Sequence, residues 1–544
     1  MRSRIPGGIT LHDTVIRNGI VFDGTGAEGA LAEVALNGGS ITSVGEVPEP
    51  GRLEIDATGL AVAPGFVDIH SHSDLSLMWD PLGQSKLRQG VTTEVVGNCG
   101  LSPAPATVES REQMTEAFQY IWADVPWTWY SMGEYLDALQ DSQPALNVAA
   151  QVGHSALRAC VLGFEDRPAD EAELRALCDL LRKSLDEGAC GLSSGLIYAP
   201  SVYATEEEFH ALGKVLAERG KYYSSHMRGE GATLMDSIDE TVRVGEAAGV
   251  QVQIVHLKTA GKPNWGNAGR ALEQIEAARD RGIDVGFDVY PYVAGSTHLS
   301  AMVSPWAHEG GTEALLKRLA DPALRARLKD EQVNGYPEWQ SYTGKGSWDP
   351  ANIWVASVGS EANQGLLGRT LQDIADERGQ DPRDAVYDLI VEEGNQLSGI
   401  AKLMCEEDVE TILQHPLGSV GSDGLAICPK GVFGRSKPHP RWYGTFPRVL
   451  SRYVRERGVL TLPDAIRKMT SLPAAQAGLS GKGALKPGLD ADVVVFDPKT
   501  VHDEATFEDP HRYASGIPWV IVNGAVAVRE GEITGERNGR VLRG

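Results

Sequence analysis

The chain has 544 residues, of which 42% are hydrophobic and 23% charged, a composition typical of a folded globular protein. Acidic residues number 74 and basic residues 50, so the net charge of −24 disfavours nucleic acid and anionic membranes as partners. No window approaches the roughly 18 uncharged apolar residues of a membrane span, and the start, MRSRIPGGITLHDT, lacks the apolar region of a secretory leader. Six cysteines in so long a chain predict no disulfide framework, and we therefore expect a cytoplasmic protein.

Both ends of the chain predict β-structure. TVIRNGIVFDGTG and EVALNGGSITSVG near the start alternate apolar and polar residues around Asn-Gly and Gly-Gly turns, the pattern of β-hairpins. DADVVVFDP and WVIVNGAVAV near the end show the same pattern. Each set is too short to form a domain alone. We therefore expect one small β-sandwich domain built from residues 1–62 and 481–544, with the rest of the chain inserted between them.

The middle of the chain, residues 63–480, alternates short β-rich runs with helical patterns such as TEEEFHALGKVLAERG. The runs are LAVAPGFVDIH, GVTTEVVG, ALNVAAQVGH, ACGLSSGL, KYYSSHM, VQVQIVH, GIDVGFDVYPY and LGSVGSDG. Eight such β-α units over roughly 250 or more residues predict an α/β fold with a TIM-like (β/α)8 barrel. The long gap before the last run predicts an insertion around residues 299–365. A doubly wound open sheet is the alternative, but it does not explain the residues at the strand ends.

Metal-binding residue types recur where these runs end. The first run ends in DIHSHSD, where His70 and His72 are two apart and so point the same way on an extended strand. Partly exposed histidines would give the same His-x-His pattern, so this signal alone is modest. Four further strand ends supply Cys99, His226, His256 and Asp423. Active sites of this barrel form at the carboxyl ends of its strands, and a set of nitrogen, sulfur and carboxylate ligands favours zinc.

Two of these residues could instead have purely structural roles. Cys99, on a sharp turn in GNCG, is either a small buried apolar residue or a reactive or metal-bound thiolate. Asp423, in GSDG, is equally suited to an Asx turn. The four histidines at neighbouring strand ends favour the metal interpretation for both. The other five cysteines occupy ordinary helix, strand or loop positions.

The motifs HSH after GFVD, GNCG, HMRGEG, HLK and GSDG resemble those of the amidohydrolase superfamily. Together with KPHPRWYGTFPRVL they are similar to its D-aminoacylase (N-acyl-D-amino-acid deacylase) family over nearly the whole chain. HxH identifies only the superfamily, whereas the cysteine turn combined with HPRxxGTFPRVL is more specific. Many superfamily members bridge two metals with a carboxylated lysine on the fourth strand. The run GLSSGLIYAP has no lysine, and Cys99 matches the thiolate that this family uses instead.

The resemblance implies a role for each candidate residue. A tighter zinc ion is expected at Cys99, His226 and His256, and a weaker second position at His70, His72 and Asp423. Asp423 is also expected to move a proton from the attacking water to the leaving nitrogen. The free α-carboxylate of the substrate is expected at Lys258, Tyr290, Ser296 and Arg441. Arg435, in the loop before Arg441, is an alternative anchor, and the number of working metals is left open.

Three further polar residues lie near the predicted ligands in the sequence. Arg228 and Glu230 follow His226 in HMRGEG and are expected to support it. His154 ends the third run, where it is either such a support or a structural residue.

The implied activity is zinc-dependent hydrolysis of N-acyl-D-amino acids to a carboxylate and a free D-amino acid. The D configuration rests on the resemblance alone. Alternatives are a D-residue dipeptidase, a cyclic amidase of the dihydropyrimidinase type and a non-catalytic scaffold. The missing lysine argues against the cyclic amidase, and the complete ligand set argues against the scaffold. The acyl group, the side chain of the substrate and the oligomeric state are left open.

Overall fold

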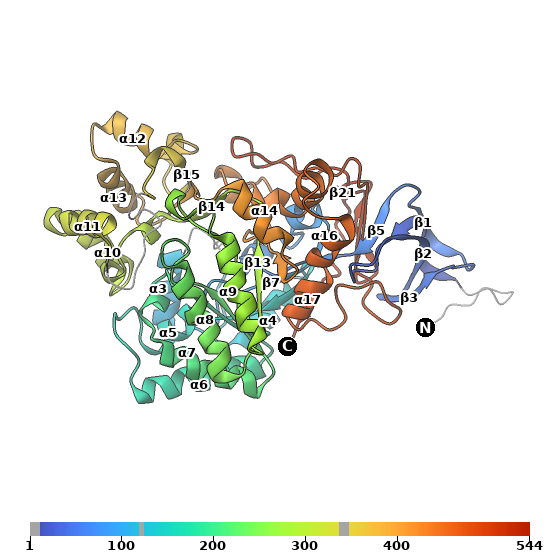
Figure 1. Cartoon of the computed structure of the whole chain (residues 1–544), viewed down its shortest axis with the longest axis horizontal. Helices are drawn as coiled ribbons and strands as arrows, with labels where there is room; N and C mark the ends of the chain where they lie inside the picture. Colours follow the sequence, from blue (N-terminus) through green and yellow to red (C-terminus); the bar gives the residue numbers. More distant parts are fainter. Residues whose placement is uncertain (1–10, 119–124, 337–346) are drawn as a thin grey trace.

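The structure is a computed structural model that describes residues 11–118, 125–336 and 347–544. Residues 1–10, where the sequence predicts no secretory leader, and residues 337–346 of the predicted insertion lie outside these ranges. Helices alternate with strands through the middle of the chain and several sheets form, so the fold class is α/β (Figure 1). Within the described ranges, no helix is long and apolar enough to cross a membrane.

The central strands are parallel and lie in two hydrogen-bonded arcs. The first arc contains, in spatial order, β6 (Phe66–Asp68), β7 (Val91–Val96), β8 (Asn147–Ala150) and β22 (Val541–Leu542). The second contains β9 (Val152–Gly153), β10 (Gly191–Gly195), β11 (Tyr222–His226), β12 (Val252–Ile254), β13 (Val285–Val289) and β17 (Gly418–Val420). Beyond β17, the Asp423 N–H donates to the His70 carbonyl at 2.8 Å, and Ser71 bridges to Gly424. The end of the last strand therefore meets the end of the first.

Amphipathic helices follow the parallel strands. Those that follow the strands β9–β13 include α6 (Glu171–Asp186), α7 (Glu206–Glu218), α8 (Leu234–Ala248), α9 (Ala268–Asp280) and α14 (Glu406–Gln414). In α6 the Asp170 side chain accepts from the first-turn N–H groups and Glu173 completes a capping box. The helix then buries Leu177, Leu181 and Leu185, spaced four apart, so one apolar stripe faces the core.

Strands from both ends of the chain share one nine-stranded sheet. Its strands are β1 (His12–Val21), β2 (Ala30–Asn37), β3 (Ser40–Gly45), β4 (Gly51–Asp56), β5 (Ala61–Pro64), β18 (Val493–Phe496), β19 (Trp519–Val522), β20 (Ala525–Arg529) and β21 (Glu532–Ile533). The antiparallel pair β5–β18 joins the two ends of the chain. Gly38 and Gly39 turn between β2 and β3 with positive φ angles of 54° and 87°, as the Gly-Gly hairpin signal predicts.

A separate sheet, with antiparallel strands, lies between β13 and β17 along the chain. It consists of β14 (Ala294–His298), β16 (Leu397–Lys402) and β15 (Ile353–Val358), in that spatial order. Four helices accompany it, namely α10 (Thr312–Ala320), α11 (Pro322–Asn334), α12 (Leu371–Arg378) and α13 (Pro382–Glu392). They form a separate hydrophobic cluster with β15 and β16 and lie at the opposite end of the molecule from β1–β3 (Figure 1). This unit extends on both sides of the residues 299–365 that the sequence assigns to the insertion.

Candidate metal centre

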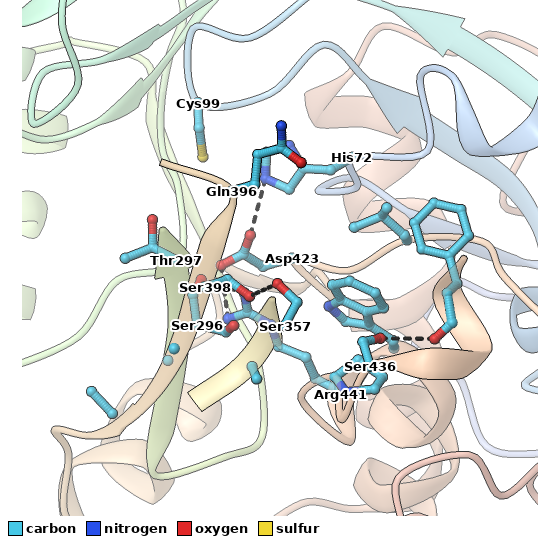
Figure 2. A pocket seen from close by; sticks show the side chains of 18 of the residues that line it. His72, Cys99, Ser296, Thr297, Ser357, Gln396, Ser398, Asp423, Ser436 and Arg441 are labelled. Carbon is cyan, nitrogen blue, oxygen red and sulfur yellow. Dashed lines mark hydrogen bonds and ion pairs between the residues drawn. The ribbon is translucent and has the colours of Figure 1, made fainter. Parts of the chain in front are cut away.

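Side chains from the ends of five parallel strands meet in one buried cluster. His70, His72, Cys99 and Asp423 place one ligand atom each within 4.8 Å of one another, and Cys99, His226 and His256 form a second such group. Every member is at least nine-tenths buried. Cys99 belongs to both groups, and Figure 2 shows it in the same pocket as His72 and Asp423. Imidazole, thiolate and carboxylate donors at this spacing fit a zinc site, with the cysteine shared between two metal positions.

Three of the candidate ligands adopt a left-handed backbone that side chains rarely take. The φ angles of Cys99, His256 and Asp423 are 53°, 38° and 49°. Such conformations cost on the order of 1–3 kcal/mol each and persist where surrounding contacts hold them. In GNCG a Cβ on Gly97 would come within 2.3 Å of the Gln151 carbonyl, so only glycine allows the turn to pack there. The turn directs the cysteine side chain toward the strand-end histidines.

The surroundings of Cys99 favour the thiolate over the thiol. Its Sγ lies 3.3 Å from His70 Nε2 and 3.7 Å from His256 Nε2. Burial alone would raise the pKa of this thiol, but the charge of His70 and hydrogen bonds from the histidines hold it well below its usual value. By contrast, burial raises the pKa of Cys190 to about 12. The thiolate is the form of cysteine that binds a metal, so the environment separates Cys99 from an ordinary buried cysteine.

A layer of carboxylates orients the histidines. Asp288 Oδ1 lies 3.1 Å from His70 Nδ1 and accepts a 2.8 Å hydrogen bond from the backbone N–H of His256. Glu230 Oε1 lies 2.9 Å from His256 Nδ1, and its other oxygen is 3.8 Å from His226 Nε2. Such partners fix the ring orientation of ligating histidines. The sequence predicts the support from Glu230; Asp288 is missed because DVYPY reads only as a strand and turn.

The residues expected to bind the carboxylate of the substrate line the same cavity. Arg441, the first residue of α15 (Arg441–Arg448), is 3% exposed, and its Nη1 lies 2.9 Å from Asp423 Oδ2. Its guanidinium stacks 4.7 Å from the centre of the Tyr290 ring, with the Lys258 ammonium 5.7 Å from the same ring. Arg441 Nη2 also donates to the Ser296 carbonyl at 3.3 Å. The structure therefore places all four predicted residues together.

The alternative anchor, Arg435, has a different environment. It lines the cavity from the loop before Arg441, but its side chain is exposed at the rim, whereas Arg441 is buried beside Asp423. His154 and Arg228 do not line the cavity. His154 lies between Ser201 and Glu208, at 2.5 Å and 2.7 Å, and Arg228 pairs with Glu240 at 3.0 Å.

The cavity has a volume of about 610 Å³, which is within the usual range for small-molecule sites. Tyr198 lines it from the loop after β10 and was not expected from the sequence. Its ring meets His226 edge-on at 5.2 Å, and its hydroxyl lies 2.9 Å from Thr297 Oγ1. The only sequence signal for it is its position just beyond a strand end, in GLIYAP.

One buried lysine, Lys86, contacts two of the parallel strands and the turn that carries Asp423. Lys86, in α2 (Gln84–Leu87), lies 2.6 Å from Asp68 and 2.7 Å from Glu94, and it donates to Ser422 Oγ at 2.8 Å. All three charged side chains are fully buried. Ser422 N–H in turn donates to Asp68 at 2.9 Å. Lys86 therefore joins β6, β7 and the turn that carries Asp423.

We expect Lys86→Met to lower the free energy of unfolding by about 3–5 kcal/mol, because it leaves two buried carboxylates without their cation. Shifting the Ser422–Asp423 turn should also lower kcat/KM. Lys482→Met is the matched control, since Lys482 is a buried lysine in the loop before β18 that pairs with Asp490 and Asp492 at 2.9 Å and 2.7 Å. Denaturant unfolding measures the loss of stability of each variant. Kinetics under conditions in which both variants are still folded measure the loss of kcat/KM separately. Equal losses of kcat/KM in the two variants would contradict a positioning role for Lys86.

An α/β fold with buried nitrogen, sulfur and carboxylate ligands at the ends of its parallel strands is the arrangement of a metal-dependent enzyme. The family model described as the amidohydrolase family matches residues 53–528. The D-aminoacylase of Alcaligenes xylosoxydans xylosoxydans is 37% identical over 97% of both chains. A D-aminoacylase structure, from work on its binuclear metal centre, superposes with a TM-score of 0.82 at 36% identity, covering 98% of this chain and all of the other. An N-acyl-D-glutamate deacylase of Bordetella bronchiseptica, in complex with zinc and a phosphonate inhibitor, gives 0.83 at 34% with the same coverage.

The chain therefore belongs to the amidohydrolase family, within its D-aminoacylase branch. The family predicted from the sequence motifs is confirmed.

Proposed function

We propose that this chain is a zinc-dependent hydrolase that cleaves the amide bond of N-acyl-D-amino acids, releasing a carboxylate and a free D-amino acid. The observation that carries the proposal is one cavity holding both the Cys99-centred ligand cluster and the Arg441–Tyr290–Lys258 group. The first fits a metal that acts on an amide, and the second fits the free carboxylate of an N-acyl amino acid. The activities named for the relatives support the same reaction.

The proposed architecture follows the sequence prediction. Residues 63–480 form one closed (β/α)8 barrel with an insertion that includes 299–365, and the bridge from Ser71 to Gly424 supports closure between its last and first strands. Residues 1–62 and 481–544 form the small β-sandwich domain; the sheet shared by both ends supports this, while β22 at the end of the second range pairs with β8 of the central strands. The partner is a small N-acyl amino acid, and the cytoplasmic location stays a prediction.

In the proposed site, Cys99, His226 and His256 hold the tighter zinc ion, and His70, His72 and Asp423 contribute to a second position. Bound zinc supplies Lewis acidity toward the substrate carbonyl and lowers the pKa of water to about 7. The thiolate provides the negative charge that a bridging carbamate would provide, and β10 offers no lysine for a carbamate. The lack of that lysine also argues against a cyclic amidase.

Asp423 is the proposed proton carrier. Burial would raise its pKa, but Arg441 and His70 hold it well below the usual value, so the group is a carboxylate in the ligand-free chain. It therefore starts as the acceptor of a proton from the attacking water and then donates that proton to the leaving nitrogen. A substrate carboxylate competes with Asp423 for the Arg441 guanidinium, which brings the substrate next to the proton carrier.

Lys258, Tyr290, Ser296 and Arg441 are the proposed anchor for the α-carboxylate. Burial raises the pKa of Tyr290 well above its usual value, so its hydroxyl stays a hydrogen-bond donor. Lys258 is held beside His256 by an ion pair with Glu230, and Arg441 presents a planar pair of donors suited to a carboxylate. This geometry favours Arg441 over Arg435 as the anchor.

The test is hydrolysis of matched N-acetyl-D- and N-acetyl-L-amino acids, with zinc measured on the same protein sample. We expect release of D-amino acids alone, from protein that carries at least one zinc per chain. Protein prepared identically from an Asp423→Asn gene controls for acylases of the host. A zinc-loaded chain inert on every N-acyl amino acid but active on a cyclic amide would contradict the proposal.

A further inference from the structure

We infer that the substrates of this chain carry uncharged, apolar D side chains, and that the acidic class named for the N-acyl-D-glutamate deacylase relative is not accepted well. This inference rests on the proposed function and deepens it, because it names the class of amino acid. The inference rests on the positions of the charged side chains in the cavity and on their ion-pair partners.

The buried charges of the cavity are already engaged at its base. Lys258 forms an ion pair with Glu230, and Arg441 pairs with Asp423 and is the proposed anchor of the α-carboxylate. Glu230 is 3% exposed and Lys258 6%, so this pair is buried and the Lys258 ammonium already has its carboxylate. No described buried cation that lines the cavity is left over for a second, side-chain carboxylate.

The walls above the base are neutral. Apolar side chains come from the GNCG turn, the insertion and the loop after β17, namely Leu101, Met302, Val358, Leu403, Leu425 and Phe433. The antiparallel sheet adds small hydroxyl and amide groups, including Ser357 and Ser398, whose hydroxyls lie 2.5 Å apart and so engage each other (Figure 2). Apolar walls stabilise a bound apolar side chain by removing its surface from water.

Among the described lining residues, the remaining charged side chains, Glu361 and Arg435, belong to exposed residues and have opposite signs. An acidic side chain placed against the neutral walls would lose its hydration without a buried cation to replace it. A basic side chain would meet the same cost. The cavity of about 610 Å³ is large enough for a long or aromatic side chain together with an acetyl group.

The test is a panel of N-acetyl-D-amino acids at fixed acyl group, with kcat/KM measured for D-Leu, D-Met, D-Phe, D-Glu, D-Asp and D-Lys on zinc-loaded enzyme. We expect the apolar group to exceed each charged substrate by about 100-fold or more. Highest activity on D-Glu or D-Asp would overturn this inference and leave the proposed function standing. Inactivity on the whole panel would overturn the proposed function, and the inference with it.

Variants at two positions test which part of the cavity distinguishes apolar from acidic substrates. Arg435→Gln should leave the ratio of D-Leu to D-Glu activity within about threefold, since a rim charge contributes little. Val358→Arg adds a cation to the neutral wall and should raise relative activity on D-Glu at least about tenfold, whereas Val358→Met, of similar length, should not. Zinc content and residual D-Leu activity show that each variant is folded. Loss of D-Glu activity in Arg435→Gln, or an unchanged ratio in Val358→Arg, would contradict the assignment of the neutral wall to the side chain.

Discussion

Replacing Cys99 by alanine is expected to lower the zinc content of the purified chain to a small fraction of one ion and to reduce kcat/KM by about 10³-fold or more. The thiolate is the ligand common to both groups at the centre, so its loss weakens both metal positions at once. The measurements are metal analysis after exhaustive dialysis and kinetics with added zinc. Cys99→Ser tests the same point with nearly unchanged volume, because a neutral hydroxyl is a poor zinc ligand.

Cys190→Ala is the matched control for this experiment. Cys99 and Cys190 are 3% and 4% exposed, and both are buried without a disulfide. Only Cys99 has histidine nitrogens within 4 Å of its sulfur, whereas Cys190 packs in a small apolar cluster with Ile69 and Val95. Cys190→Ala should therefore keep its zinc and its activity. Full zinc retention in Cys99→Ala, or equal zinc loss in both variants, would contradict the ligand role of Cys99.

The cluster at the strand ends could be predicted from the sequence because parallel strands in a barrel carry their carboxyl ends to one edge. His70, Cys99, His226 and His256 each end or directly follow a β-rich run, so the topology alone brings them together. The same topology predicts Lys258, two residues beyond His256. The structure places the predicted ligands and carboxylate anchors around one cavity, with His70 buried behind it in the ligand cluster, whereas His154 and Arg228 lie away from the cavity.

Other parts of the site could not be read from local patterns. Lys86 lies in a four-residue helix that carries no sequence motif, and its partners are 18 residues away in Asp68 and 336 away in Ser422. Asp288 lies within a strand run, where a buried carboxylate would normally be disfavoured, and it is stabilised there by His70, the His256 backbone and the Gln253 amide. Contacts between segments so distant in sequence leave no periodicity to detect.

The limits of the insertion also do not follow from local sequence patterns. Residues of α12 and α13 have the amphipathic spacing of any helix packed on a sheet, and spacing does not reveal which sheet. In the structure α13 packs into the separate hydrophobic cluster, and the antiparallel pairing of β16 with β14 and β15 sets the unit apart from the parallel strands. The boundary of the insertion is set by the pairing of β14 with β16, which lie about 100 residues apart. A single sequence carries no signal for a pairing between such distant strands.

Asp423→Asn is expected to reduce kcat by about 10²–10⁴-fold, the range that general acid–base catalysis contributes, while zinc stays bound. An asparagine has nearly the shape of the aspartate but neither accepts the proton of the attacking water nor returns it to the leaving nitrogen. Zinc should remain because Cys99, His226 and His256 form a complete ligand group without Asp423. The measurements are steady-state kinetics on an N-acetyl-D-amino acid and metal analysis of the same sample.

Asp503→Asn separates this effect from the cost of breaking a buried ion pair. Asp503 is 7% exposed and pairs with Arg448 at 2.9 Å, and that guanidinium stacks 4.6 Å from the centre of the Tyr292 ring. Asp423, which is 9% exposed, pairs with Arg441 at the same distance beside Tyr290, so the two pairs match in charge, in stacking and in the burial of the carboxylate. Both variants should lose stability, because each leaves an arginine without its carboxylate. Only Asp423→Asn should lose kcat, since only Asp423 also lies within ligand distance of His70, His72 and Cys99; comparable losses of kcat in both would assign Asp423 a structural role alone.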